Sequence, residues 1–191
     1  MNIFSRISYN SPVILTFSLI ASLVFIIDSL LGGILMPFFS LSPYFQPSSF
    51  SWYFSLFAYT LGHASIGHLF GNIAFILLLG PILEEKYGSK TLLLMMAATA
   101  LITALLNIIL FSTGILGASG IVFMMIILVS FANTKENEIP LSFILVLVLY
   151  LGKEVFNAFE ADSTSQFAHI IGGLAGAAFG LLPLIKKNTK I

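Results

Sequence analysis

Long apolar runs that carry almost no charge are the feature that most limits what this chain can fold into. A helix needs about 20 apolar residues to cross the hydrocarbon core of a bilayer, and several runs reach that length. Composition agrees, because 58% of the 191 residues are hydrophobic and only 8% are charged. Such a chain has too little polar surface to cover a soluble globule. The sequence therefore predicts an all-α membrane protein, and we expect residues 1–191 to form one domain.

Six stretches are candidates for membrane spans. They cover approximately residues 12–31, 66–83, 90–111, 119–132, 139–158 and 166–185. The charge-free segment 32–62 is interrupted by Pro37, Pro43 and Pro47, so we expect a membrane-associated outer loop with short helices instead of a span. No small-residue cleavage site follows the first stretch, and we expect that stretch to be a retained helix.

The basic residues predict how the six spans are oriented. Seven of the eight lysines and arginines fall on one side of a six-span arrangement, and only Lys153 does not. The seven are Arg6, Lys86, Lys90, Lys135, Lys186, Lys187 and Lys190. Because basic loops stay in the cytoplasm, we expect cytoplasmic termini and a location in the plasma (inner) membrane. Segments 32–62, 112–118 and 159–165 would then lie outside.

The fourth stretch is too short for an ordinary span. It covers about 14 residues, or about 21 Å of helix, against a hydrocarbon core of about 30 Å. It begins at Ser119 in LGASGIVFM and is followed by the polar segment 133–138. We therefore expect the helix to begin part-way through the membrane. A non-helical turn at that depth must be buried or line a wet cavity, which predicts Ser119 at the bottom of an outward-facing cavity.

His169 lies one turn into the sixth stretch and precedes a regular row of glycines. Gly172, Gly176 and Gly180 are spaced by four residues, so they share one helix face and let another helix approach closely. If the sixth stretch packs on the fourth along this row, His169 meets Ser119.

These residues supply the parts of a serine hydrolase. Serine is a weak nucleophile until a base takes its proton, and His169 can act as that base at near-neutral pH. His68 and Asn72 lie four apart on one helix face and can donate to an oxyanion. Backbone N–H groups at the start of the fourth stretch, from Gly117 to Ser119, would complete the oxyanion site. No carboxylate is well placed as a third member, so we predict a Ser–His dyad.

Four motifs, HASIGHLFGN, GPILEEKYG, GASG and AHIIGGLAG, occur in this order on the second, fourth and sixth stretches. With them the chain resembles a rhomboid intramembrane serine protease of the minimal six-helix bacterial type, over nearly its whole length. The resemblance implies that Ser119 is the nucleophile, His169 the base, and His68 and Asn72 oxyanion donors, while Glu84 is a structural anchor. It also implies that the substrates are transmembrane segments of other membrane proteins, cut near their outer ends.

The chain departs from the family pattern at two places. Many relatives have Trp-Arg where this chain has Trp52-Tyr53, and many have tyrosine where it has Phe123, four residues after the serine. A phenylalanine retains stacking against the histidine but lacks the hydroxyl. The loop before His169, EADSTSQ, is polar.

Other functions remain as alternatives. An inactive rhomboid-like membrane scaffold or chaperone is the main one. A metal-dependent protease is disfavoured because no H-E-x-x-H occurs, and a transporter because no internal repeat is present. Without cysteines, disulfides and thiolate zinc sites are excluded, so we expect no metal and no cofactor. A net charge of zero argues against nucleic acid as a partner. For His68 and Asn72, a purely structural network is the alternative, and the role of His63 stays open.

Overall fold

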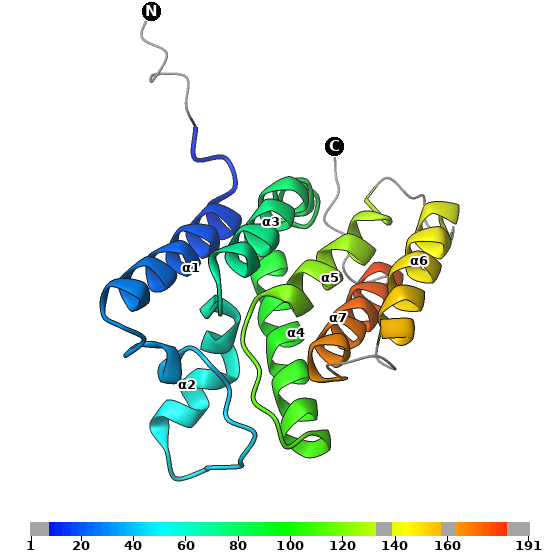
Figure 1. Cartoon of the computed structure of the whole chain (residues 1–191). Helices are drawn as coiled ribbons and strands as arrows, with labels where there is room; N and C mark the ends of the chain where they lie inside the picture. The colour runs from blue at the N-terminus through cyan, green and yellow to red at the C-terminus, as the bar shows by residue number, and fades with distance from the viewer. Residues whose placement is uncertain (1–7, 133–138, 158–162, 183–191) are drawn as a thin grey trace, which may run out of the picture.

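The computed structural model describes residues 8–132, 139–157 and 163–182. In Figure 1 these residues form helices and connecting loops, and they contain no strand. The seven α-helices are α1 (Pro12–Leu30), α2 (Phe50–Ala58), α3 (Ile66–Tyr87), α4 (Ser89–Leu110), α5 (Ser119–Val129), α6 (Leu141–Asn157) and α7 (Ser163–Leu181). Two short 3₁₀ helices, η2 (Met36–Phe38) and η3 (Tyr59–Leu61), flank α2.

The predicted all-helical architecture is confirmed, and each predicted stretch coincides with a helix to within a few residues. The additional helix, α2, lies inside segment 32–62, where short helices were expected. Within the described residues, α1, α3 and α4 are long and apolar enough to cross a membrane, while the apolar helices α5 and Gln166–Leu181 are shorter. The predicted loop at 133–138 and most of the loop at 159–165 lie outside the described residues.

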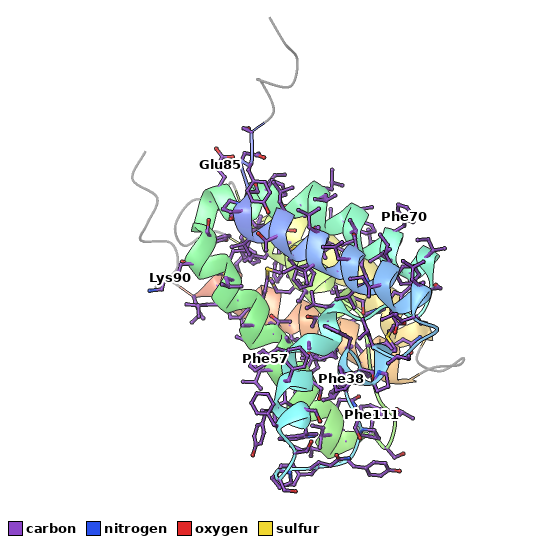
Figure 2. All side chains as sticks on the ribbon, turned by 90° about the vertical axis from the view of Figure 1, so that its left-hand side faces the viewer. Phe38, Phe57, Phe70, Glu85, Lys90 and Phe111 are labelled. Atoms are coloured by element: carbon purple, nitrogen blue, oxygen red, sulfur yellow. The ribbon has the colours of Figure 1, made fainter. Side chains whose placement is uncertain are left out.

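Large apolar side chains project outward from the long helices. Leu30, Leu78 and Ile109 are 80%, 65% and 74% exposed. Figure 2 shows Phe57 and Phe70 on the outside as well, whereas the charged Glu85 and Lys90 lie near the corner between α3 and α4. An apolar surface of this extent is unfavourable in water and fits a membrane bundle.

The helix α5 is the centre of the bundle. Every residue from Gly120 to Leu128 is buried. It contacts α3, α4, α6 and α7, between which it runs in Figure 1. A helix that is apolar on all sides is stable only when other elements surround it. The chain therefore holds the helix that starts with Ser119 from all sides.

The glycine row of α7 packs directly on α5, as its spacing predicted. A Cβ added at Gly172 would lie 2.0 Å from the carbonyl oxygen of Gly120, and one at Gly176 would lie 2.4 Å from that of Met124. Both distances are far below any tolerated contact, so the two backbones touch. Only glycine allows α7 to approach α5 this closely.

Two charged side chains hold helix ends in place. The buried carboxylate of Glu84 accepts the N–H groups of Val13 and Ile14 at 3.0 and 3.1 Å, at the start of α1. Its Oε1 also accepts the hydroxyl of Ser89 at 2.7 Å. Negative charge is favourable at a helix N-terminus, so this carboxylate joins α1, α3 and the start of α4. The arrangement agrees with the structural role that the rhomboid resemblance implied.

Lys86 binds the chain directly after the C-terminal end of α5. Its Nζ donates to the carbonyl oxygen of Phe131 at 2.7 Å and to that of Ala132. Both carbonyl groups lie in the turn directly after α5, and a cation there is favourable because it offsets the negative end of the helix dipole. The end of α5 is thereby tied to the end of α3.

Candidate active site

The segment before α5 is held by residues of the long loop that follows α1. Leu41 and Ile115 form an isolated antiparallel bridge, with N–H to oxygen distances of 2.8 and 3.2 Å. The N–H of Gly117 donates to the carbonyl oxygen of Tyr59 at 2.9 Å. The backbone that delivers Ser119 to the start of α5 is thus fixed at two points.

Gly117 brings this backbone against α3. Its φ of +113° lies in the region that only glycine adopts readily. A Cβ at this position would lie 2.6 Å from Cε1 of His68 and 3.7 Å from Nδ2 of Asn72. The side chains of His68 and Asn72 therefore both reach the backbone two residues before Ser119.

The N–H of Gly117, a residue predicted to belong to the oxyanion site, donates to the carbonyl oxygen of Tyr59 within the protein. Because Gly117 has no side chain, it leaves space for the ring of His68 and the amide of Asn72. The N–H of Ser119, by contrast, belongs to the first turn of a helix, where N–H groups have no acceptor within the helix.

Asn72 combines burial with an unused donor. Its side chain is 6% exposed, and its Nδ2 has no hydrogen-bond partner among the described residues. An unpaired buried amide costs free energy, and such groups in native proteins usually have a reason. Asn72 lies one turn after His68 on α3. The start of that helix is capped by Ser65, whose Oγ accepts the N–H of His68 at 3.1 Å.

His63 lies behind His68. It is 1% exposed, and its Nδ1 lies 3.2 Å from the carbonyl oxygen of Leu61. The rings of His63 and His68 meet edge to face, with centroids 5.0 Å apart. Burial, and to a smaller extent the neighbouring His68, lowers the pKa of His63 to about 4. His63 is therefore neutral near pH 7 and supports the ring of His68.

His169 stacks on Phe123. The ring centroids are 4.3 Å apart and the planes differ by 8°. Phe123 lies one turn after Ser119 on α5, and helical side chains lean toward the N-terminus of their helix. The imidazole is therefore beside the first turn of α5. The expectation that phenylalanine retains the stacking is confirmed.

A cavity of about 380 Å³ opens next to Ser119. Its walls come from α3, η3, the segment 113–117, α5 and α7, and they include His68, Gly117, Ser119 and Ala168. His169 and Asn72 do not line this Ser119 cavity, although each lies beside a residue that does. Pockets of this size accommodate small ligands or short peptide segments.

Sequence reasoning missed two residues that build the site. Leu41 and Tyr59 hold the segment before Ser119, although they precede it by many residues. The hydroxyl of Tyr59 donates to the carbonyl oxygen of Ala100 at 3.1 Å, and burial raises its pKa well above the usual range. It therefore stays protonated. The charge-free composition of segment 32–62 signalled a buried loop but gave no means of pairing its residues with others.

Among the described residues, no cluster of three or more histidine or acidic side chains could hold a metal ion. The acidic residues Glu160 and Asp162 of the predicted outer loop lie outside the described residues.

Comparison with known proteins identifies the family. The sequence matches the family profile of the Rhomboid domain over residues 50–186, which is more than half of the chain. The search of curated proteins found no match. The match covers α2 to α7 and so includes Ser119, His169, His68 and Asn72. Rhomboid proteins are multi-pass membrane proteins and are generally intramembrane proteases that act on other membrane proteins in the bilayer. The chain belongs to the rhomboid family.

Proposed function

We propose that this protein is an intramembrane serine endopeptidase, in which Ser119 is the nucleophile and His169 the general base. The observation that carries the proposal is the stacking of His169 on Phe123, one helical turn after Ser119. A stacked ring keeps its orientation, and we infer that this orientation holds the imidazole near the serine hydroxyl. The backbones of Gly172 on α7 and Gly120 on α5 are also in contact. This contact fixes the distance between the two helices that carry His169 and Ser119.

The reaction proceeds in two halves. His169 takes the proton of the Ser119 hydroxyl as Oγ attacks the scissile carbonyl carbon. The tetrahedral intermediate collapses, His169 gives the proton to the leaving amine, and an acyl-enzyme with an ester at Ser119 remains. Water, deprotonated by His169, then attacks the ester, and the proton returns to Ser119 as the acid product leaves.

Charge on the intermediate requires donors that are already in place. The Nδ2 of Asn72 is buried, lies near Gly117 and has no hydrogen-bond partner in the described part of the chain, which suits an oxyanion donor that needs no reorganisation. We assign His68 and the N–H of Ser119 to the same site. The start of α5 adds the positive end of a helix dipole.

The membrane arrangement follows from the same proposal. We infer one domain of six spans, with both termini in the cytoplasm of the plasma (inner) membrane, and with α5 as a shortened fourth span. The 11 residues of α5 cover about 16 Å, so Ser119 would lie within the bilayer. Water reaches it through the Ser119 cavity, and the substrates are transmembrane segments of other proteins.

The test is cleavage of a single-span model substrate in proteoliposomes. Wild-type protein should release two fragments, and Ser119→Ala should release none, although its thermal stability should be unchanged because only a hydroxyl is removed. A serine-directed activity probe is applied to both proteins as an independent readout. It should label wild type at Ser119 and leave Ser119→Ala unlabelled.

The two readouts separate the alternatives. Labelling without cleavage would mean that the model substrate is wrong and the enzyme is active. Failure of both cleavage and labelling in folded wild-type protein would contradict the proposal and favour a rhomboid-like membrane scaffold or chaperone.

A further inference from the structure

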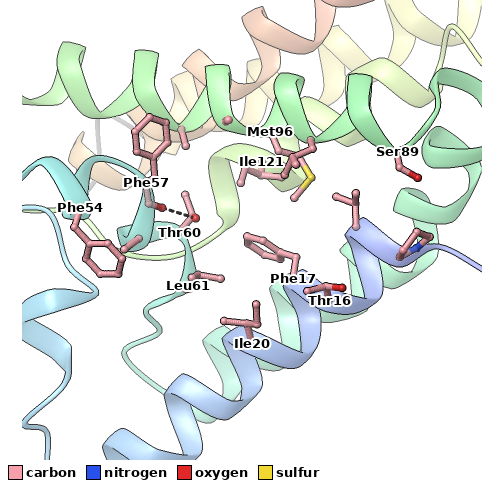
Figure 3. Close-up of a pocket in the computed structure, with 16 residues that line it drawn as sticks. Thr16, Phe17, Ile20, Phe54, Phe57, Thr60, Leu61, Ser89, Met96 and Ile121 are labelled. Atoms are coloured by element: carbon pink, nitrogen blue, oxygen red, sulfur yellow. Dashed lines mark hydrogen bonds between the residues drawn. The ribbon is translucent and has the colours of Figure 1, made fainter. Parts of the chain in front are cut away.

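A second and larger hollow lies between α1 and α4. It has a volume of about 640 Å³, and Figure 3 shows its walls. Phe17 and Ile20 project into it from α1, Met96 from α4 and Ile121 from the first turn of α5, while Phe57 and Leu61 close one end. We refer to it as the α1–α4 groove.

No hydroxyl on the walls of the α1–α4 groove is unused. Thr16 is hydrogen-bonded to the hydroxyl of Tyr9 at 2.9 Å. Thr60 donates to the carbonyl oxygen of Phe57 at 2.8 Å, and Ser89 donates to Glu84 at 2.7 Å. Because these groups already have partners inside the protein, the groove offers an occupant only apolar contact. A peptide backbone or a polar ligand would lose its hydrogen bonds with water and gain none here.

The dimensions of the groove select one kind of apolar occupant. Along α4 it extends from Ser89 to Ala100, which corresponds to about 16 Å at 1.5 Å per residue. That is about half of the hydrocarbon core, the depth of one leaflet. A spanning helix about 10 Å wide and about 30 Å long would occupy roughly 2,400 Å³, several times the groove. A single acyl chain fits both the length and the volume.

A cation stands at the end where such a chain would enter. Lys90 directly follows Ser89, is exposed, and projects from the start of α4 in Figure 2. Glu85, also exposed, lies at the same end of the molecule and carries the opposite charge to Lys90. Lysine near a membrane surface attracts the phosphate of a lipid head group and leaves its stem along the apolar chains.

We propose that the α1–α4 groove binds one acyl chain of a phospholipid, with the head-group phosphate beside Lys90 and the chain end near Ile121. The occupant comes from the leaflet in which α1 and α4 begin. The site is separate from the Ser119 cavity and depends on the membrane location of the protein, not on the catalytic role of Ser119. By helix geometry, Ile121 and Ser119 face opposite sides of α5, so the lipid chain would pack behind the turn that carries the serine.

Two adjacent leucines give a matched test. Leu93 lines the groove and Leu94 does not, yet they are 53% and 61% exposed on the same helix. Trp52 is the sole tryptophan, so Leu93→Trp and Leu94→Trp are made in a Trp52→Phe background. Each protein is loaded with phosphatidylglycerol carrying brominated chains, which quench tryptophan, and is then diluted into detergent without bromine.

Quenching should persist about tenfold longer at Leu93→Trp than at Leu94→Trp, which corresponds to about 1.4 kcal/mol of additional binding. Adding Ala97→Phe, which fills the groove one turn further along α4, should abolish the difference. Lys90→Gln should shorten retention about fivefold, the scale of one lysine at a lipid surface.

Equal recovery at both leucine positions would overturn the proposal, as would retention that survives Ala97→Phe. An unchanged retention in Lys90→Gln would overturn the assignment of the head group to this end. If a single-span substrate helix without lipid altered the fluorescence of Leu93→Trp but not of Leu94→Trp, the groove would be a substrate site and the proposal would be wrong.

Discussion

Two hollows meet the first turn of α5, and they differ in what they leave unpaired. Beside the Ser119 cavity, the Nδ2 of Asn72 is buried and has no partner among the residues that the structure describes. In the α1–α4 groove, the hydroxyls of Thr16, Thr60 and Ser89 all have partners within the protein. An unused buried donor costs free energy and is available to a group that enters the site, whereas a saturated apolar wall suits hydrocarbon. The first turn of α5 therefore has a site suited to polar chemistry on one side and a site suited to lipid on the other.

Removal of the base should cause the largest loss on the polar side. His169→Ala should lower kcat by about 10⁴-fold, at the upper end of the range for general base catalysis, because it removes the proposed acceptor of the serine proton. Cleavage of the model substrate in proteoliposomes measures this. His63→Gln is the matched control, since His63 is buried behind His68 and makes its ring contact with that residue, and it should lose far less activity. Equal losses in both variants would contradict the assignment of the base.

Asn72→Ala tests whether the unpaired amide serves the substrate or the fold. If it donates to the oxyanion, kcat should fall about 10²-fold while KM changes little. Thermal stability should fall by less than the roughly 1 kcal/mol of a lost hydrogen bond, because Nδ2 has no partner to lose among the described residues. Undiminished turnover, or a large loss of stability with normal turnover, would favour the structural network instead.

Gly172→Ala tests whether backbone contact sets the distance between serine and histidine. The new methyl group would meet the carbonyl oxygen of Gly120, so α7 and α5 must separate. We expect turnover to fall between about 10-fold and 10²-fold, the scale of a misplacement near 1 Å, and stability to fall by about 1–3 kcal/mol.

Gly71→Ala on α3 is the control for this substitution. A Cβ there has nothing within 4 Å, and alanine favours a helix over glycine. This variant should be as active as wild type and at least as stable. A normal rate in Gly172→Ala would mean that α5 and α7 tolerate separation without loss of geometry.

His63 predicts a pH dependence of stability. Its pKa falls from 6.5 to about 4 on folding, because burial disfavours the charged ring. Between pH 6.5 and about pH 4, His63 is therefore protonated in the unfolded chain and neutral in the folded protein. The stability contributed by the neutral His63 ring is fully present above pH 6.5 and is lost as the pH falls toward 4. The free energy of unfolding decreases by about 2 kcal/mol in this range. Melting in detergent at pH 7 and pH 4.5 should show a smaller drop for His63→Gln than for wild type. Identical drops would exclude His63 as the source.

The smallest effect is expected from the apolar side. Ala97→Phe fills the α1–α4 groove without touching the Ser119 cavity, so turnover should change by less than about threefold, the scale of a surface substitution. A large loss would show that the first turn of α5 responds to both hollows, and the contrast between them would have to be revised.

The sequence allowed most of the helices to be predicted well, because they are apolar runs bounded by glycine, proline or polar residues. The start of α5 at Ser119 was predicted to the residue for this reason. The contacts between segments that lie far apart in the sequence could not be predicted. The bridge between Leu41 and Ile115 is a pairing of two loops, and nothing in either loop identifies its partner.

The site was predictable to the same extent. Its histidines, serine and asparagine are chemically distinctive in an apolar chain, whereas the use of the Gly117 N–H by Tyr59 depends on where a loop folds back. The α1–α4 groove had no signal at all in the sequence. It is an empty space between ordinary apolar residues of five elements.

Under the proposed mechanism, the contact of Lys86 with the turn after α5 has a consequence for the depth of cleavage. An ammonium group stays close to the water interface, and the 11 residues of α5 separate that interface from Ser119 by about 16 Å. In a hydrocarbon core of about 30 Å, the peptide bond that is cut would then lie about 14 Å below the opposite surface. The choice of bond would follow from how far along its own axis a substrate helix unwinds at that level, so helix length and stability in the substrate would matter alongside its side chains.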